Sequence, residues 1–373
     1  MKFIVYADIH HDEHAAKCLT LKDTLEIERQ VFARAAEGGF DFALFAGDRF
    51  LKREPKDEVK VLADQGLLDG LSWQKPGFAY FHLVGNHDRV DNTLGWHTAE
   101  SLAMQFKGAG IHPGVMGKPG TYSAEGLPVA VHALPAGYKM DGGLYTVPPQ
   151  ALNIFAFHDI VKGSTSDAEG KHVFSEGIPI SDLDLSEFDV VYAGDIHVPQ
   201  KFNFKHTKGG YVGAVLQRTR ADAGQPRGWL EVDAEYVGDQ WRLKTTFVPT
   251  RNFFTRYALD VLPETTWAAL VNQIDDQWVT DQAVEVRLKG SKADVDRLAD
   301  EPRWQNYTQV ILARKFDVLR EYQTENQAAV VNLSDTGSPI EDLTLYLDSG
   351  FADVGTLSRD KLFTILEGAH GSQ

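Results

Sequence analysis

Five short motifs in this sequence combine aspartate, histidine and asparagine, whose side chains are suited to holding metal ions. In chain order they are Asp8-Ile9-His10, Gly47-Asp48, Gly85-Asn86-His87-Asp88, His158-Asp159 and Gly194-Asp195-Ile196-His197. Their oxygen and imidazole donors suit Mn, Fe or Zn, whereas Mg or Ca would favour mostly oxygen. One such motif is a weak signal, because a lone aspartate after a strand is more often a helix cap or a turn former. Five in order, at spacings that leave room for strands and helices, predict a metal centre.

Each motif follows a short apolar run that we expect to form a strand. The runs cover residues 3–7, 42–46, 78–84, 152–157 and 190–193, and helical stretches lie between the early ones at 25–37, 59–68 and 98–106. Near-continuous apolar runs are typical of strands buried on both faces. Strand–helix alternation predicts an α/β domain, in which ligands gather beyond the carboxyl ends of the strands. The glycines before Asp48, Asn86 and Asp195 permit sharp turns that would aim these side chains at one point.

The pattern changes after residue 249. Residues 257–261 and 284–288 alternate with period two, as half-buried strands do, and residues 308–313 are expected to form a third strand. Helical segments at 265–274 and 292–298 separate them. Further on, Ser338-Pro339-Ile340-Glu341 is a capping box with proline at the first helical position, which predicts the first of two C-terminal helices. We therefore expect a metal-site domain over 1–249, a small α+β capping domain over 250–320, and a linker with C-terminal helices over 321–373.

The composition is that of an ordinary globular chain. Of its 373 residues, 43% are apolar and 24% are charged. No stretch reaches the roughly 18 uncharged apolar residues of a membrane span. Asp8 interrupts the N-terminal apolar run too early for a signal peptide, and a single cysteine, Cys18, excludes an internal disulfide. We expect a cytoplasmic protein with no membrane partner.

The charge is negative but uneven. A net charge of −16 argues against a nucleic-acid ligand, because phosphate binding favours a basic surface. Residues 197–230, however, hold six lysines and arginines against the single acid Asp222, whereas residues 321–373 have a balance of −7. A metal site also attracts phosphate through its own charge. The charge therefore lowers the expectation of a DNA or RNA ligand without excluding one.

The five motifs resemble the pattern of the calcineurin-like metallophosphoesterase superfamily, which runs D-x-H, G-D, G-N-H-[D/E], a lone H and G-H-x-H. The resemblance implies a β-sandwich flanked by helices that carries two divalent metal ions. It implies that one ion is held by Asp8, His10, Asp48 and His197. The second would be held by Asp48, Asn86, His158 and Asp195, with Asp48 bridging the two ions.

The same resemblance suggests a mechanism. Two divalent cations about 4 Å apart lower the pKa of a water molecule, which then attacks phosphorus in line, and they neutralise the phosphoryl oxygens. His87 is not needed as a ligand and is free to protonate or orient the leaving oxygen. Asp88 is expected either to position His87 or to form the turn. Asp195 stands where the superfamily usually has histidine, so we predict an intact two-metal site with an altered metal preference.

Residues 192–200 and 211–219 look like the SbcD nuclease branch, in which a histidine motif with Pro-Gln leads into a Y-x-G-S segment. Members of that branch process DNA ends as exonucleases and endonucleases, together with an SMC-like ATPase called SbcC in bacteria. The resemblance implies DNA as substrate, Mn²⁺ as metal, and an SbcC-like ATPase docked on the C-terminal helices. It also suggests a homodimer. Leu51 departs from the pattern, because relatives often have histidine or aspartate there.

Other interpretations stay open at this point. The chain would also suit a stand-alone metallophosphoesterase for a small phosphodiester or a phosphoprotein, for which an acidic surface is less awkward. A catalytically impaired scaffold, in which Asp195 marks a decayed site, is the non-enzymatic alternative. The basic residues of 197–230 would either follow a DNA backbone or form a solvated loop, and Arg49, Lys52, Arg53 and Lys56 are candidate phosphate contacts.

Overall fold

The computed structural model describes residues 1–13, 19–90, 97–166, 170, 172–183, 185–202, 208–219, 222–274, 282–304, 307, 313 and 315–322. The chain divides into two compact units. One holds Met1–Tyr257, Ile274–Val286 and Pro302–Asp317, and the other holds Ala258–Gln273, Arg287–Glu301 and the chain from Val318 onwards. The domain division predicted at residues 249 and 320 stays a prediction, as do the two C-terminal helices, which lie outside the described residues.

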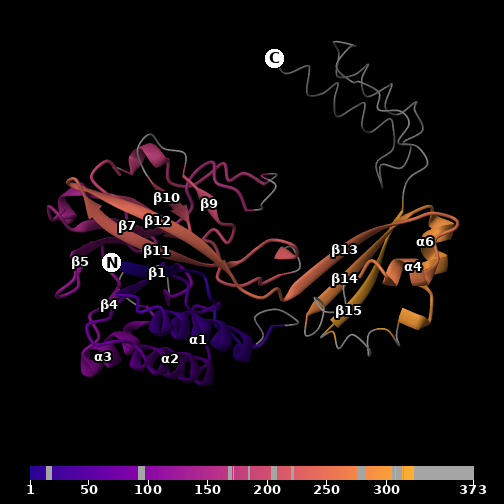
Figure 1. Cartoon of the computed structure of the whole chain (residues 1–373), viewed down its shortest axis with the longest axis horizontal. Helices are drawn as coiled ribbons and strands as arrows, with labels where there is room; N and C mark the ends of the chain where they lie inside the picture. The colour runs from indigo at the N-terminus through magenta and orange to yellow at the C-terminus, as the bar shows by residue number, and fades with distance from the viewer. Residues whose placement is uncertain are drawn as a thin grey trace, which may run out of the picture. The chain divides into compact units, whose positions relative to one another are not determined.

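Two six-stranded sheets form the first unit (Figure 1). The first sheet consists, in spatial order, of β12 (Gln240–Pro249), β11 (Gly228–Val237), β1 (Lys2–Tyr6), β2 (Phe42–Phe45), β3 (Ala79–Leu83) and β4 (Pro113–Met116). The second consists of β5 (Gly120–Ser123), β6 (Val129–Leu134), β7 (Leu152–His158), β8 (Val190–Gly194), β10 (Gly209–Tyr211) and β9 (Gln200–Lys201). Strands β1 to β4 pair in parallel, and so do β6, β7, β8 and β10. All five strands predicted ahead of the motifs are therefore present.

The inner faces of the two sheets pack on each other. Phe3 and Val5 of β1 point into this layer and meet residues of the second sheet such as Ile154 and Val190. The rings of Phe3 and Phe42 stack with their centroids 4.4 Å apart. Burial of both sheet faces explains why the strands read as continuous apolar runs rather than alternating ones. The arrangement is a β-sandwich, as predicted.

Three helices, α1 (Leu21–Glu37), α2 (Asp57–Ser72) and α3 (Glu100–Ala109), accompany the first sheet (Figure 1). Helix α1 begins with a capping box, in which the Thr20 backbone N–H donates to Asp23 at 2.9 Å. Its buried side chains, including Ile27 and Val31, recur at helical spacing and pack against Ile4 and Tyr6 on the outer face of β1. The helices therefore seal the face of the sheet that the sandwich leaves open.

A third sheet has the order β13 (Phe254–Val261), β14 (Ala283–Gly290) and β15 (Lys315–Tyr322). The short helices are α4 (Trp267–Val271) and α6 (Lys292–Ala299), together with the 3-10 turns η1 (Gly142–Leu144) and η2 (Ile180–Asp182) of the first unit. The strand predicted at 308–313 lies almost entirely outside the described residues and stays a prediction, and the third strand of this sheet is β15. Within the described residues, no helix has both the length and the apolar character needed to cross a lipid bilayer.

Candidate metal centre

The loops that follow β1 and β2 run side by side and bring the first two motifs together. The backbone N–H of Asp8 donates to the Gly47 carbonyl at 3.0 Å, and that of His10 donates to the Asp48 carbonyl at 3.1 Å. Asp8, His10 and Asp48 have positive φ angles of 53°, 51° and 62°, and Asp195 has one of 87°. Such left-handed conformations cost about 1–3 kcal/mol each and cluster at functional sites, where the surroundings hold them in place. The backbone is bent so that these side chains face a common centre.

Two glycines of the motifs are required by space. A Cβ atom on Gly85 would meet the carboxylate and backbone nitrogen of Asp48, and one on Gly194 would meet the Ala46 carbonyl and the His158 ring. These contacts are closer than real Cβ atoms make, so only glycine lets the neighbouring motifs pack on the strand ends. The predicted role of these glycines in sharp turns thus has a second part, which is close approach between strands.

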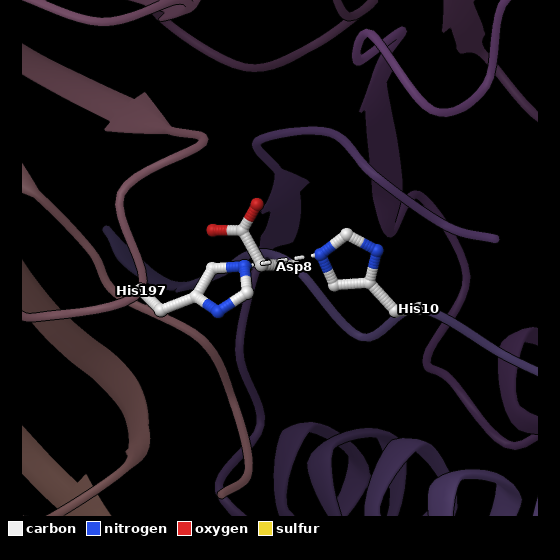
Figure 2. Close-up of side chains that lie close together, drawn as sticks. All are labelled: Asp8, His10 and His197. Atoms are coloured by element: carbon white, nitrogen blue, oxygen red, sulfur yellow. Dashed lines mark hydrogen bonds between the residues drawn. The ribbon is translucent and has the colours of Figure 1, made fainter. Parts of the chain in front are cut away.

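The first predicted ligand group gathers around Asp8 (Figure 2). His10 Nε2 lies 3.1 Å from His197 Nε2, and donor atoms of both rings and of the Asp8 carboxylate lie within 4.8 Å of one another. Figure 2 shows the two imidazole rings facing each other with the carboxylate beside them. A spacing of 3.1 Å between nitrogens suits two ligands of one ion at metal–nitrogen distances of about 2.0–2.1 Å.

The second predicted group lies around Asp48. Its Oδ1 atom is 3.2 Å from His158 Nε2, while its Oδ2 atom is 3.6 Å from His10 Nε2. Asp48 therefore lies between the two groups, where the bridging ligand was expected. Asp195 Oδ1 accepts from Asn86 Nδ2 at 3.3 Å and lies 3.8 Å from His158 Nε2. The structure brings all seven predicted ligands to one place, although their role as ligands stays a prediction.

Two of these side chains have a buried polar atom without a hydrogen-bond partner among the described residues. They are Oδ2 of Asp8 and Oδ1 of Asn86. Leaving a buried acceptor unsatisfied costs about 1–3 kcal/mol, so such atoms require an explanation. Both are electron-pair donors and belong to the predicted ligand set. The donor set therefore fits divalent cations such as those that the superfamily resemblance implies.

Backbone carbonyls fix the orientation of three histidines. Nδ1 lies 3.3 Å from the Phe50 carbonyl in His10, 2.6 Å from the Leu51 carbonyl in His87 and 2.7 Å from the Ala46 carbonyl in His158. A carbonyl only accepts, so Nδ1 is the donor in each case and Nε2 is left for the site. Hydrogen bonds of this kind are typical of histidines that bind metal through the other nitrogen.

The metal-free site holds excess negative charge. Burial, together with the neighbouring Asp48 carboxylate, raises the pKa of Asp8 to about 8. Burial acts in the opposite direction on His158, yet the charges of Asp48, Asp8 and Asp195 raise its pKa well above the ordinary value. Burial lowers the pKa of His10, and it lowers that of His197 to about 4, so both rings are neutral ligands at neutral pH. Protons therefore occupy the centre of the site when no cation is present.

Of the two roles left open for Asp88, the structure shows the contacts of a turn residue, and a role in positioning His87 stays a prediction. The Asp88 carboxylate accepts backbone N–H groups of Asp48, Arg49, Phe50 and Gly85 at 2.8–3.3 Å. Among the described residues the His87 ring bonds instead to the Leu51 carbonyl, and its backbone N–H donates to Asp48 Oδ1 at 2.9 Å. Asp88 therefore forms the turn, the second of the two roles left open. Its carboxylate holds the Asp48 loop rather than the His87 ring.

No family model matches the chain. Over 343 residues the chain is 24% identical to the DNA double-strand break repair protein Mre11 of Haloferax volcanii, an alignment that covers 91% of this chain and 68% of that protein. Similarity over nine-tenths of the chain comes together with five motifs that meet at one point of a β-sandwich. These findings agree with the resemblance of the motifs to the calcineurin-like metallophosphoesterase superfamily.

Solved structures with a similar arrangement include a dimetal phosphatase from Danio rerio and a single mutant of Vps29 from Entamoeba histolytica. The first is 10% identical, covers 66% of this chain and 95% of its own, and has a TM-score of 0.40. The second is 11% identical, covers 66% of this chain and 99% of its own, and has a TM-score of 0.29. At these TM-scores the similarity supports no conclusion about the activity of this chain.

Arg49 is a candidate phosphate contact that the structure rules out. Although it follows Asp48, its side chain is fully buried beneath the site and donates to Glu28 at 2.6 Å and to the Ala63 carbonyl at 2.6 Å. Glu28 Oε2 also lies 3.2 Å from His11 Nε2, so one carboxylate links the residues that follow both His10 and Asp48. This buried network supports the two loops of the candidate metal centre from behind. The sequence gives no sign that a charged side chain next to a candidate ligand, such as Arg49, points into the core.

Proposed function

We propose that this chain is a two-metal phosphodiesterase, acting as an SbcD-like DNA exonuclease or endonuclease subunit together with an SMC-type ATPase. The observation that carries the proposal is the convergence of the candidate ligands at one point, where buried oxygens of Asp8 and Asn86 have no hydrogen-bond partner in the described chain. Buried acceptor atoms without hydrogen-bond partners are hard to explain by a structural role alone, because each one lowers the stability of the fold. They are what a site for two cations would contain.

When bound, two divalent cations would acidify a water molecule and neutralise charge on the phosphoryl oxygens. The chain supplies the remaining functions. His87 presents Nε2 to the site, because the Leu51 carbonyl occupies Nδ1, and it is the proposed general acid for the leaving oxygen. The predicted ligands of the first ion are Asp8, His10, Asp48 and His197, and those of the second are Asp48, Asn86, His158 and Asp195. Asp88 keeps the Asp48 loop in shape.

The second ligand group would hold three oxygens and one nitrogen, because Asp195 contributes a carboxylate. Oxygen-rich sites favour Mn²⁺ or Mg²⁺ over Zn²⁺, which supports Mn²⁺ as the metal of this chain. We expect Asp195→His to raise the affinity for Zn²⁺ relative to Mn²⁺, as measured by competition calorimetry. Asp233→His on the exposed part of β11 is the control and should leave the ratio unchanged. An unchanged ratio in Asp195→His would mean that residue 195 is not a ligand.

DNA as substrate and an ATPase as partner rest on the likeness to Mre11, a DNA double-strand break repair protein by name. A chain of net charge −16 would gain from a partner that supplies basic surface. We place that contact on the predicted C-terminal helices, whose apolar residues at helical spacing are Leu343, Tyr346, Leu347, Leu362, Ile365 and Leu366. These helices lie outside the described residues. The proposal also includes a cytoplasmic location and a homodimer.

The first experiment incubates the full chain with Mn²⁺ and end-labelled linear DNA, and in parallel with a generic aryl phosphodiester. We expect DNA shortening that requires Mn²⁺ and falls by about 10²- to 10⁴-fold in His87→Ala, with Mn²⁺ stoichiometry unchanged. His112→Ala, at a residue outside the predicted ligand set, is the matched control. Hydrolysis of the small ester alone would favour the stand-alone phosphoesterase. Turnover of neither substrate by the Mn²⁺-loaded chain would favour the impaired scaffold.

A further inference from the structure

Arg218 is a buried arginine beside the proposed metal centre that no step above uses. It lies between β10 and β11, in the basic stretch of residues 197–230, and its exposed fraction is 3%. Its Nη1 atom donates to the backbone carbonyls of Ile9 and His10 at 3.2 Å each. The guanidinium therefore lies against the loop that carries Asp8 and His10. A solvated loop, one of the two readings of this stretch, does not describe Arg218.

The turn that carries Arg218 is built to hold it. Asp222 Oδ2 accepts the backbone N–H of Arg218 and of Thr219 at 2.9 Å each. The neighbouring Gln217 donates to the Asp222 and Gln225 carbonyls at 3.0 and 3.1 Å. Backbone and side-chain bonds thus fix the position of the residue before any ligand arrives, which is the pre-organisation that an anion-binding site requires.

The other nitrogens of the guanidinium remain available. Among the described residues, Nε and Nη2 of Arg218 form no hydrogen bond. Neither of them belongs to the fully buried polar atoms that lack a partner. Both nitrogens therefore reach open space. Because Nη1 bonds to the Ile9 and His10 carbonyls, this guanidinium lies beside the loop that carries the candidate ligands Asp8 and His10. Burial lowers the pKa of Arg218 to about 10, so it is still a cation at neutral pH.

We propose that Arg218 binds a non-bridging oxygen of the phosphoryl group through its free Nε–H and Nη2–H donors, while Nη1 holds the metal-site loop. An arginine fork matches the geometry of a phosphate and gives charge-assisted hydrogen bonds. Fixed donors of this kind stabilise negative charge that develops on phosphoryl oxygens during attack. Arg218 is thereby a substrate-binding residue of the proposed phosphodiesterase, and the inference rests on that proposed function.

The test measures inorganic phosphate binding to the Mn²⁺-loaded full chain by calorimetry, in the wild type and in Arg218→Gln, Arg218→Lys and Arg242→Gln. Arg242 lies exposed on β12 and is the matched control. We expect phosphate affinity to fall by about 10-fold or more in Arg218→Gln, with a smaller loss in Arg218→Lys, which keeps the charge without the fork. The Mn²⁺ affinity of each variant, measured separately, should stay close to that of the wild type.

Three results would separate the possibilities. Phosphate binding by Arg218→Gln equal to that of Arg242→Gln would overturn the inference. A parallel loss of Mn²⁺ and phosphate affinity in both Arg218 variants would also overturn it, because Arg218 would then only hold the loop. If the wild type binds phosphate through Arg218 but hydrolyses neither DNA nor the aryl ester, the inference stands and the proposed function fails. With an active wild type, we expect Arg218→Lys to raise KM for the aryl ester as well as lower kcat.

Discussion

At the scale of single residues, the centre is organised by charge. The carboxylates of Asp8 and Asp48 lie within 4.8 Å of each other, and the Asp195 carboxylate, 16% exposed, lies 3.8 Å from the same His158 ring that Asp48 contacts. Such a cluster repels itself unless protons or cations neutralise it. Without cations, protons neutralise the cluster. This is why the pKa of Asp8 is raised to about 8 and the pKa of His158 is raised as well. Metal and protons therefore compete for the same atoms.

This competition predicts how the stability of the metal-free chain depends on pH. The pKa of Asp8 is about 3.9 in an unfolded chain and about 8 in the folded one. Its stabilising contribution is therefore complete below about pH 4 and is lost as the pH rises through 8, and His158 acts in the same direction. The lowered pKa values of His10 and His197 act in the opposite direction below about pH 6.5, so we expect Tm in EDTA to fall between about pH 6.5 and pH 8.

The matching measurement adds Mn²⁺. Because ligands bind cations in their deprotonated form, the increase in Tm caused by Mn²⁺ should grow over the same pH range. The variant Asp8→Asn removes the titrating carboxylate and should flatten the profile in EDTA. A wild-type Tm in EDTA that rises steadily from about pH 6.5 to pH 8 would contradict the charge assignment of the centre.

At the scale of elements, the strand ends must approach closely for the motifs to meet. Gly85→Ala would push a methyl group against the Asp48 carboxylate and backbone. We expect this variant to bind Mn²⁺ more weakly by about tenfold or more, since an ångström of displacement is enough to misplace a ligand. Gly108→Ala in α3 meets open space and is the control, expected to be neutral or stabilising by about 0.5–1 kcal/mol. Equal Mn²⁺ affinity in the two variants would remove the argument from close approach.

The helices act on the centre through the buried pair of Glu28 on α1 and Arg49 after β2. Glu28→Ala would leave the Arg49 guanidinium buried with Asp64, 3.6 Å from its Nε, as its remaining carboxylate. Breaking a buried pair in this way costs about 3–5 kcal/mol, which denaturant unfolding would measure. Replacing Glu231 by Ala, which breaks the more exposed pair with Arg34, should cost about 0.2–1 kcal/mol. A similar small loss in Glu28→Ala would mean that the buried network does not support the loops.

At the scale of the whole molecule, the net charge of −16 controls how DNA is approached. Without cations the chain has few ways to release counterions from a duplex, so we expect a dissociation constant above about 10⁻⁵ M in EDTA at physiological salt. Fluorescence anisotropy with labelled duplex, repeated with Ca²⁺ to limit cleavage, should show tighter binding once cations are present. Submicromolar binding in EDTA with a steep salt dependence would indicate a basic surface that the described residues do not explain.

The positions of the ligands could be predicted because they depend on local patterns. A run such as residues 3–7 is apolar throughout, so it reads as a doubly buried strand, and the polar residues that follow must leave the sheet at its carboxyl edge. The helices after β1, β2 and β3 were predicted for the same reason, to within a few residues at each end. The strand β15 at Lys315–Tyr322 was not predicted, because alternation in a partly exposed strand is a weaker signal.

The sequence by itself determined which donor atoms this protein brings to one edge of its sandwich, since residue type and strand order are written along the chain. Only the tertiary structure decided what those atoms face. Arg218 donates a hydrogen bond to the Ile9 carbonyl, 209 residues away in the sequence. The Asp88 carboxylate accepts hydrogen bonds from backbone N–H groups 38 to 40 residues away and not from the adjacent His87 ring. Such partners depend on how distant elements pack, because a buried donor or acceptor must find its match in space rather than along the chain.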